Sequence, residues 1–221
     1  MQRLDRETRK VMVVNGAKHP LSSTDLLYLP RKLGGRGLKS IEREYKTIKI
    51  KAAMNLYSNN DPTMHLVRQF EEKAARTGRR SLIKDAESYS QQLGLRLELQ
   101  YPQPVGVTET GNVLDRKKFS GWTKKVNQSR GCAEIESERW QGKLIAERWR
   151  DENVDEECFA WLSDWKTAPI KTVAGLQELY QQLLPTKLYA SRKTKTHTDS
   201  DEKCRLCRRA QESVTHVVSG C

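Results

Sequence analysis

Four side chains that commonly bind metal stand in the last eighteen residues of the chain, in the spacing C-x2-C-x8-H-x4-C, and they are Cys204, Cys207, His216 and Cys221. Two cysteines with two residues between them present both thiolates from one tight turn, and a histidine and a third cysteine can complete a tetrahedron from across a small loop. This arrangement suits Zn²⁺, and four protein ligands leave no open position for a catalytic water. The spacing therefore predicts a structural zinc site. The competing interpretation is a set of reduced surface cysteines beside an unrelated core histidine.

The remaining cysteines, Cys132 and Cys158, do not have the spacing of a disulfide framework, and Cys158 lies in an apolar row where a thiol packs as core. No stretch of the chain has the roughly 20 apolar residues that a helix needs to span a bilayer. The N-terminal residues also lack the apolar segment of a signal peptide. We therefore expect a reducing compartment, nuclear or cytoplasmic, and no membrane partner.

The net charge of +12 is unevenly distributed along the chain. Residues 1–80 carry 18 Lys and Arg against 8 Asp and Glu, whereas residues 131–165 carry 4 against 10. A basic excess confined to one third of a chain is typical of proteins that bind a polyanion, most often nucleic acid. The alternative is a solvated basic surface that maintains solubility. Membrane phosphate is a weaker alternative, since no strongly apolar helix face accompanies the charge.

Periodicity and capping residues predict a mainly α fold, with a small helical bundle, a helical linker region and a C-terminal zinc knuckle. Expected helices cover 1–15, the segments that begin at the capping residues Ser40, Asp61 and Ser81, then 132–150 and 154–165, and a segment that begins at Pro169. Residues 25–30 and 187–195 are expected to be extended, and 95–101 alternates as a strand does. We divide the chain into a basic helical bundle (1–94), an extended linker with a basic-aromatic cluster (95–130), a helical region (131–200) and the metal-binding segment (201–221).

Three glycines fall within four positions in the segment Leu29-Pro-Arg-Lys-Leu-Gly-Gly-Arg-Gly-Leu38. Glycine allows a backbone to approach a ligand closely, and the flanking Arg and Lys side chains suit a phosphate backbone. The segment lacks the Gly-Lys-Ser/Thr ending of a nucleotide-binding P-loop. A plain turn between two elements explains the same residues equally well.

Four lysines surround Trp122, and they are Lys117, Lys118, Lys124 and Lys125. The indole could stack on a nucleobase, but a tryptophan in a helical chain is more often packed core. The acidic residues of 131–165 cluster near helix N-termini, where the helix dipole accounts for them. We therefore assign no acid–base chemistry to them.

Two groups of motifs occur in order along the chain. The first group is Leu4-Asp-Arg-Glu-Thr-Arg-Lys10, His19-Pro20, Leu27-Tyr-Leu-Pro-Arg-Lys-Leu-Gly-Gly-Arg-Gly-Leu38 and Ile41-Glu42. The second is Leu183-Leu-Pro-Thr-Lys-Leu-Tyr189, Cys204-x-x-Cys207, Glu212-Ser213, His216 and Cys221. Together they resemble reverse transcriptases encoded by non-LTR retrotransposons of the restriction-like-endonuclease type. The first group resembles the segment that follows the palm, and the second resembles the downstream linker and zinc knuckle, so the likeness spans nearly the whole chain.

The resemblance implies that residues 1–94 act as a polymerase thumb, which grips the template–primer duplex, and that the knuckle helps to position target DNA or element RNA. The phosphate contacts expected under this hypothesis come from Arg31, Lys32, Arg36, Lys39, Lys46 and Lys49. The adjacent aspartates of the family's palm have no counterpart in this sequence, and no endonuclease segment follows the knuckle. Without carboxylates to hold metal ions, phosphoryl transfer has no mechanism. We therefore expect a non-catalytic nucleic-acid-binding fragment with no small-molecule substrate.

An alternative function is a zinc-dependent protein-interaction module. In this hypothesis the acidic helices of 131–165 form the docking surface, and the basic N-terminal third is merely solvated. Such a module would ignore nucleic acid and would lose a protein partner on chelation.

Overall fold

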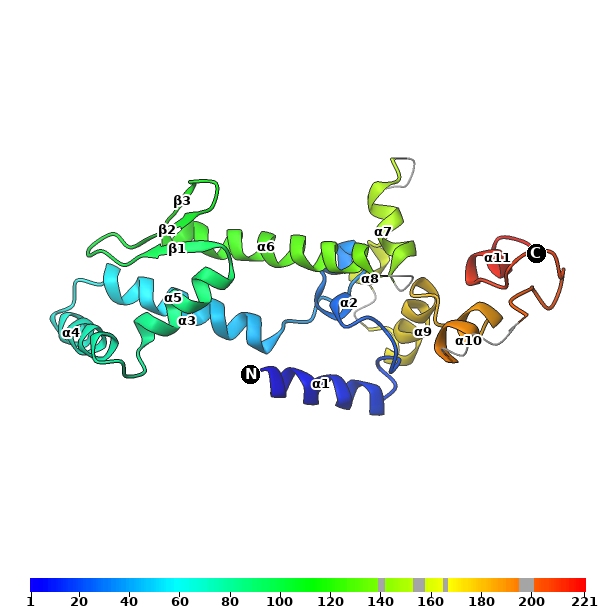
Figure 1. Ribbon diagram of the computed structural model, residues 1–221, viewed down its shortest axis with the longest axis horizontal. Coiled ribbons are helices and arrows are strands. Elements are labelled where there is room, and N and C mark those ends of the chain that lie inside the picture. The colour runs from blue at the N-terminus through cyan, green and yellow to red at the C-terminus, as the bar shows by residue number, and fades with distance from the viewer. Residues whose placement is uncertain (139–141, 153–157, 165–166, 195–200) are drawn as a thin grey trace. The chain divides into compact units, whose positions relative to one another are not determined.

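The computed structural model describes residues 1–138, 142–152, 158–164, 167–194 and 201–221 (Figure 1). The chain is mainly helical, as predicted, and it also contains one small sheet. It forms two compact units, the first from residues 1–5 and 39–129 and the second from residues 6–38 and 130–221. Among the described helices, none combines the length and the apolar character needed to cross a membrane.

The helices of the first unit begin where the capping residues predict. They are α3 (Ile41–Ser58), α4 (Pro62–Arg76) and α5 (Leu82–Gln92). Their N-cap side chains, Ser40, Asp61 and Ser81, each accept a hydrogen bond from a backbone N–H in the first turn. The first helix, α1 (Gln2–Val14), contributes the buried Asp5, whose carboxylate accepts from the Ser40 hydroxyl at 2.7 Å.

A three-stranded antiparallel meander follows α5, in the order β1 (Leu95–Glu98), β2 (Val105–Thr108) and β3 (Val113–Leu114) (Figure 1). The long helix α6 (Arg116–Ser137) comes next. Residues 95–130 thus differ from the expected extended linker. Its first prolines and glycines, Pro102, Pro104, Gly106 and Gly111, lie in the sheet and its turns. Gly106 sits so close to Leu95 across the β1–β2 pair that a Cβ there would lie 2.8 Å from the leucine side chain.

The core of the first unit joins α3, α5, the sheet and the start of α6. Its fully buried members include Ile50 and Met54 of α3, Leu95 of β1 and Phe119 of α6. Trp122 packs against the same cluster, with its ring centroid 6.2 Å from that of Phe119. The indole is therefore part of the core, as the simpler interpretation of the sequence held.

The second unit is built on residues far apart in sequence. Its elements are α2 (Asp25–Tyr28), the 3₁₀ turn η1 (Arg31–Leu33), the end of α6, α7 (Lys143–Arg150), α8 (Trp161–Asp164), α9 (Ile170–Tyr180), α10 (Lys187–Thr194) and α11 (Val214–Val218). Leu26 and Leu29 pack with Ile135, Ile145 and Phe159 in its core. These contacts explain why residues 6–38 belong with the second half of the chain and not with the expected bundle of residues 1–94.

Several expected elements differ in the structure. Residues 25–28 form a helical turn and residues 187–194 a helix, where extended segments were expected. The helix expected over 132–150 begins at Arg116 and ends at Ser137, and Gly142 adopts φ 75° before α7 starts. Of the helix expected over 154–165, only the part from Trp161 to Asp164 is helical among the described residues. Three side chains expected in these helix cores, Trp140, Val154 and Trp165, lie outside the described residues, as does Lys195 at the end of the expected basic segment.

Candidate metal centre

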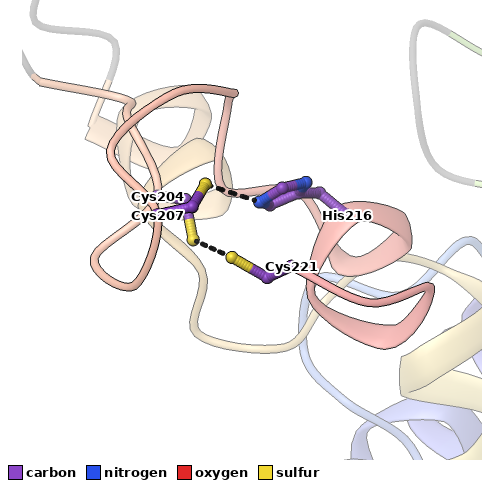
Figure 2. A group of neighbouring side chains, drawn as sticks. All are labelled: Cys204, Cys207, His216 and Cys221. Carbon is purple, nitrogen blue, oxygen red and sulfur yellow. Dashed lines mark hydrogen bonds between the residues drawn. The ribbon is translucent and has the colours of Figure 1, made fainter.

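The four predicted metal ligands converge at the C-terminal end of the second unit. The β-bridge between Lys203 and Gln211 closes a tight loop, and within it the Cys204 N–H donates to the Ala210 carbonyl at 2.8 Å. This loop presents Cys204 and Cys207 on the same side (Figure 2). The Ser213 hydroxyl caps α11 by accepting the His216 N–H at 3.0 Å, which fixes the histidine on the first turn of that helix.

The ligand atoms lie close to the separations that a tetrahedral metal ion requires. All four are within 4.8 Å of one another. The Cys204 and Cys221 sulfurs are 3.4 Å apart, and the Cys207 sulfur lies 3.3 Å from His216 Nε2 (Figure 2). Ordinary Zn–S and Zn–N bonds give tetrahedral edges of about 3.8 Å and about 3.6 Å. The cluster can therefore hold a metal ion such as zinc after a small expansion.

Backbone amides around the loop favour thiolate over thiol at the Cys-x-x-Cys pair. The Arg209 N–H, with its nitrogen 3.5 Å from the Cys207 sulfur, and the Ala210 N–H are the main causes that lower the pKa of Cys207 to about 6. Hydrogen bonds from the Cys207 and Leu206 amides lower the pKa of Cys204. The pKa of Cys221 rises to about 11 because it shares its proton with Cys207 and Cys204, and the same sulfurs raise the pKa of His216. A divalent cation binds thiolates, so an environment that favours ionisation of these thiols also favours metal binding.

A buried carboxylate beside the cluster joins it to α10. Glu212 is 2% exposed, and its oxygens accept from the Arg205 guanidinium at 2.6 Å and from the Arg205 N–H at 2.8 Å. The same carboxylate accepts the Lys187 N–H at 3.0 Å, at the first residue of α10. The Arg205 side chain, together with these amide donors, lowers the pKa of Glu212 to about 2.

Two of the six predicted phosphate contacts are occupied within the protein. The Arg31 guanidinium donates to the Leu162 carbonyl at 3.1 Å. The Arg36 guanidinium donates to the Ala17 carbonyl at 3.1 Å and to Gln177 at 3.2 Å, and burial lowers its pKa. Both arginines hold distant parts of the second unit together, so a phosphate could reach them only by displacing these bonds.

Of the four lysines predicted to contact phosphate, two form ion pairs within the protein and two are exposed. Lys46 pairs with Glu42 at 2.6 Å and Lys49 with Asp85 at 3.2 Å, and the bond to Asp85 raises the pKa of Lys49. Lys32 and Lys39 are exposed. The structure thus leaves only the last two available to a ligand without breaking an internal contact.

Local geometry requires glycine at each of the first two glycine positions of the glycine-rich segment. Gly34 ends the 3₁₀ turn with φ 83°, a left-handed conformation that favours glycine. A Cβ on Gly35 would lie 2.2 Å from the Leu29 carbonyl oxygen, so no larger residue fits. The segment behaves as a tight turn in a core, which is the simpler of its two interpretations.

The lysines in the first half of α6 form an exposed face that was not among the predicted phosphate contacts. Lys117, Lys118, Lys124 and Lys125 are exposed, while the tryptophan among them packs inward. Helical spacing over 116–130 predicts this face once the segment is treated as a helix and not as a linker.

No family model, no curated protein and no solved structure matches this chain.

Proposed function

We propose that this chain is a non-catalytic, nucleic-acid-binding part of a reverse transcriptase of the non-LTR retrotransposon type with a restriction-like endonuclease, and that Cys204, Cys207, His216 and Cys221 bind one zinc ion. The observation that carries the proposal is the convergence of three sulfurs and one imidazole nitrogen within 4.8 Å. The motif order along the sequence and the basic charge support the nucleic-acid partner.

Zinc is the metal that this donor set favours. Three thiolates and one imidazole form a soft, tetrahedral environment, which suits Zn²⁺ and disfavours Mg²⁺ or Ca²⁺. When bound, the ion would supply structural cross-linking, since the protein occupies all four positions. The protein's own residues do the rest: Ser213 orients the histidine, and Glu212 anchors the loop to α10.

The metal-binding loop presents two arginines to solvent. Arg205 is paired with Glu212, while Arg208 and Arg209 are exposed on the same loop. Guanidinium groups bind phosphate oxygens in a bidentate manner. A zinc-ordered loop would hold both of them in fixed positions for contact with target DNA or element RNA.

Metal analysis tests the zinc assignment. The wild-type protein, purified without added metal, is expected to contain about one zinc per chain. His216→Ala should lose most of it, and His65→Ala, which changes an exposed histidine on α4, should retain it. Zinc content unchanged by His216→Ala would show that the ligand assignment is wrong.

Binding to a primer–template duplex across a salt series tests the partner. Contacts between Lys or Arg and phosphates make the logarithm of the binding constant fall linearly with the logarithm of salt concentration. A steep fall supports the proposal. Absence of binding, or a response that is flat in salt, contradicts it.

A second candidate, the zinc-dependent protein-interaction module, has one observation in its favour. Three apolar side chains of the metal-binding segment are solvent-exposed, Leu206 at 77%, Val217 at 43% and Val218 at 66%. Exposed apolar groups on an ordered loop suit a protein partner. A partner that is captured by the wild type and lost after Leu206→Ser or chelation, without any nucleic-acid binding, would favour this function over the first.

A further inference from the structure

The first half of α6 has one face in the core and the opposite face in solvent. Phe119 and Thr123 are buried at 0% and 3% exposure. At 100° per residue, Gly121 lies almost opposite this buried stripe. Lys117 and Lys124 fall on one side of the glycine, and Lys118 and Lys125 fall on the other. The four lysines therefore surround an exposed glycine at the centre of the outer face.

These lysines have no acidic neighbours along the helix. No Asp or Glu occurs from Arg116 to Ala133. Within the described part of the chain, none of the four ammonium groups forms a salt bridge. The Asp115 carboxylate, at the start of the helix, is used as a cap and accepts the Lys118 N–H at 2.7 Å. The Asp115 carboxylate also interacts electrostatically with Lys117 and Lys118, so it compensates part of their charge. The face as a whole remains a concentrated positive surface.

Gly121 is unusual in the interior of a long helix. Glycine is a poor helix former because of its backbone freedom. Here the helix runs through it without interruption, and a Cβ at this position would meet no other atom within 4 Å. Packing within the protein therefore does not require the missing side chain. Its absence lets a ligand come close to the helix backbone between the lysines.

The character of this face indicates which polyanion it fits. Single-stranded nucleic acid is usually bound with aromatic side chains on which bases stack. Of the aromatic residues of this part of α6, Phe119 is fully buried, and Trp122 is partly buried with its ring packed against Phe119 and not on the lysine face. A membrane surface would call for exposed apolar groups beside the lysines, and none lies between Lys117 and Lys125 on the outer face. What remains is recognition of phosphates alone, at positions fixed by a rigid helix.

We propose that the outer face of α6, formed by Lys117, Lys118, Lys124 and Lys125 around Gly121, is a docking surface for the sugar–phosphate backbone of a nucleic-acid duplex. The inference deepens the proposed function and rests on it. Lys117 and Lys124 on one side of the glycine are seven residues apart, as are Lys118 and Lys125 on the other side. This spacing places the members of each pair about 10 Å apart along the helix axis. Long lysine side chains at this spacing reach phosphates on both sides of the point where the backbone meets Gly121. The contact is independent of base sequence.

Salt-dependent duplex binding tests the surface. In the full chain, the four lysines are changed together to glutamine. A matched control changes four other exposed cations of the same unit, Lys73, Arg76, Arg79 and Lys84, so that the net charge falls equally. The α6 variant should bind a duplex at least tenfold more weakly, and the slope of log K against log salt should become shallower by about 3 to 4. The control variant should change both quantities far less.

A second variant tests the role of the glycine without altering charge. Gly121→Gln adds a side chain in open space on the surface, so the fold should persist. We expect weaker duplex binding with an unchanged circular dichroism spectrum. If Gly121→Gln binds the duplex as tightly as the wild type, the nucleic acid does not approach the helix backbone at this point.

The outcomes separate this inference from the proposed function. If the wild type binds duplex and both quadruple variants lose affinity equally, the effect is general charge and the α6 surface is refuted while the function stands. If the wild type binds single strands or anionic vesicles as tightly as duplex, the assignment of a duplex is wrong. If the wild type binds no nucleic acid, the proposed function itself fails.

Discussion

Arg205 and Glu212 form a two-point ion pair inside the metal-binding loop, with Nη2–Oε1 at 2.6 Å and Nε–Oε2 at 2.9 Å. The carboxylate is 2% exposed, and it also accepts the first N–H of α10. One buried group thus links the loop that carries Cys204 and Cys207 to the helix before it.

Glu212→Gln should weaken metal binding although Glu212 is not a ligand. The amide cannot accept all the bonds that the carboxylate accepts, so the loop loses its fixed position; loss of such outer contacts typically costs 10- to 100-fold in metal affinity. Competition with a chromophoric chelator measures the change. Asp201→Asn is the control, because Asp201 pairs with Lys187 of the same helix only at the surface. Equal affinity in wild type and Glu212→Gln would contradict the anchoring role.

Arg68→Ala should destabilise the first unit by about 2 to 3 kcal/mol. The Arg68 side chain is 6% exposed and donates to the carbonyls of Leu56 and Asn59, both at 2.8 Å. Its guanidinium also lies 4.5 Å from the centre of the Tyr101 ring. Removal leaves buried acceptors without donors. Urea unfolding measures the free energy, and the exposed Lys73→Ala on the same helix should change it by less than about 0.5 kcal/mol.

Gly35→Ala should destabilise the second unit by about 3 kcal/mol or more, since a methyl group would collide with the Leu29 backbone. The matched change Gly121→Ala should be neutral or stabilising, because that position is open and helical. Thermal unfolding of the two variants compares them directly. A Gly35→Ala protein as stable as the wild type would mean that the turn is looser than the structure shows.

Tyr57 should make the first unit sensitive to alkaline pH. Its hydroxyl donates to Glu72 at 2.8 Å, and burial together with this bond raises its pKa well above the usual range. The unfolded-state value is about 10, so the stabilisation is complete below about pH 10 and is lost as pH rises further. Between pH 8 and pH 11, Tyr57→Phe should lose about 1.4 kcal/mol less stability than the wild type. Parallel pH profiles for the two proteins would refute this.

Local signals were sufficient where the structure is locally determined. Ser40, Asp61 and Ser81 mark helix starts because each cap bond closes within three residues. The metal ligands could be identified because a tetrahedral site imposes a spacing on the sequence itself. The pair of Lys46 with Glu42 was also within reach, since it is an i, i+4 contact on one helix.

The remainder depends on partners that are distant in sequence. Arg31 and Arg36 were expected to face phosphate, but their acceptors at Leu162 and Gln177 lie more than a hundred residues away. The sheet within the linker predicted over residues 95–130 could not be predicted, because short strands separated by glycine and proline have a weak local preference and are stabilised by pairing. The helix over residues 187–194 is likewise capped by a distant residue, since Glu212 accepts its first N–H.

The second unit is interrupted by the first, and this has a consequence for biosynthesis. Leu26 and Leu29 have their core partners at Ile135, Ile145 and Phe159. On the ribosome, the first unit emerges almost whole, because residues 39–129 are continuous. Residues 6–38 cannot bury Leu26 and Leu29 in this core until residues beyond 130 have been synthesised. During that interval the early segment is the part of the nascent chain that most needs a chaperone.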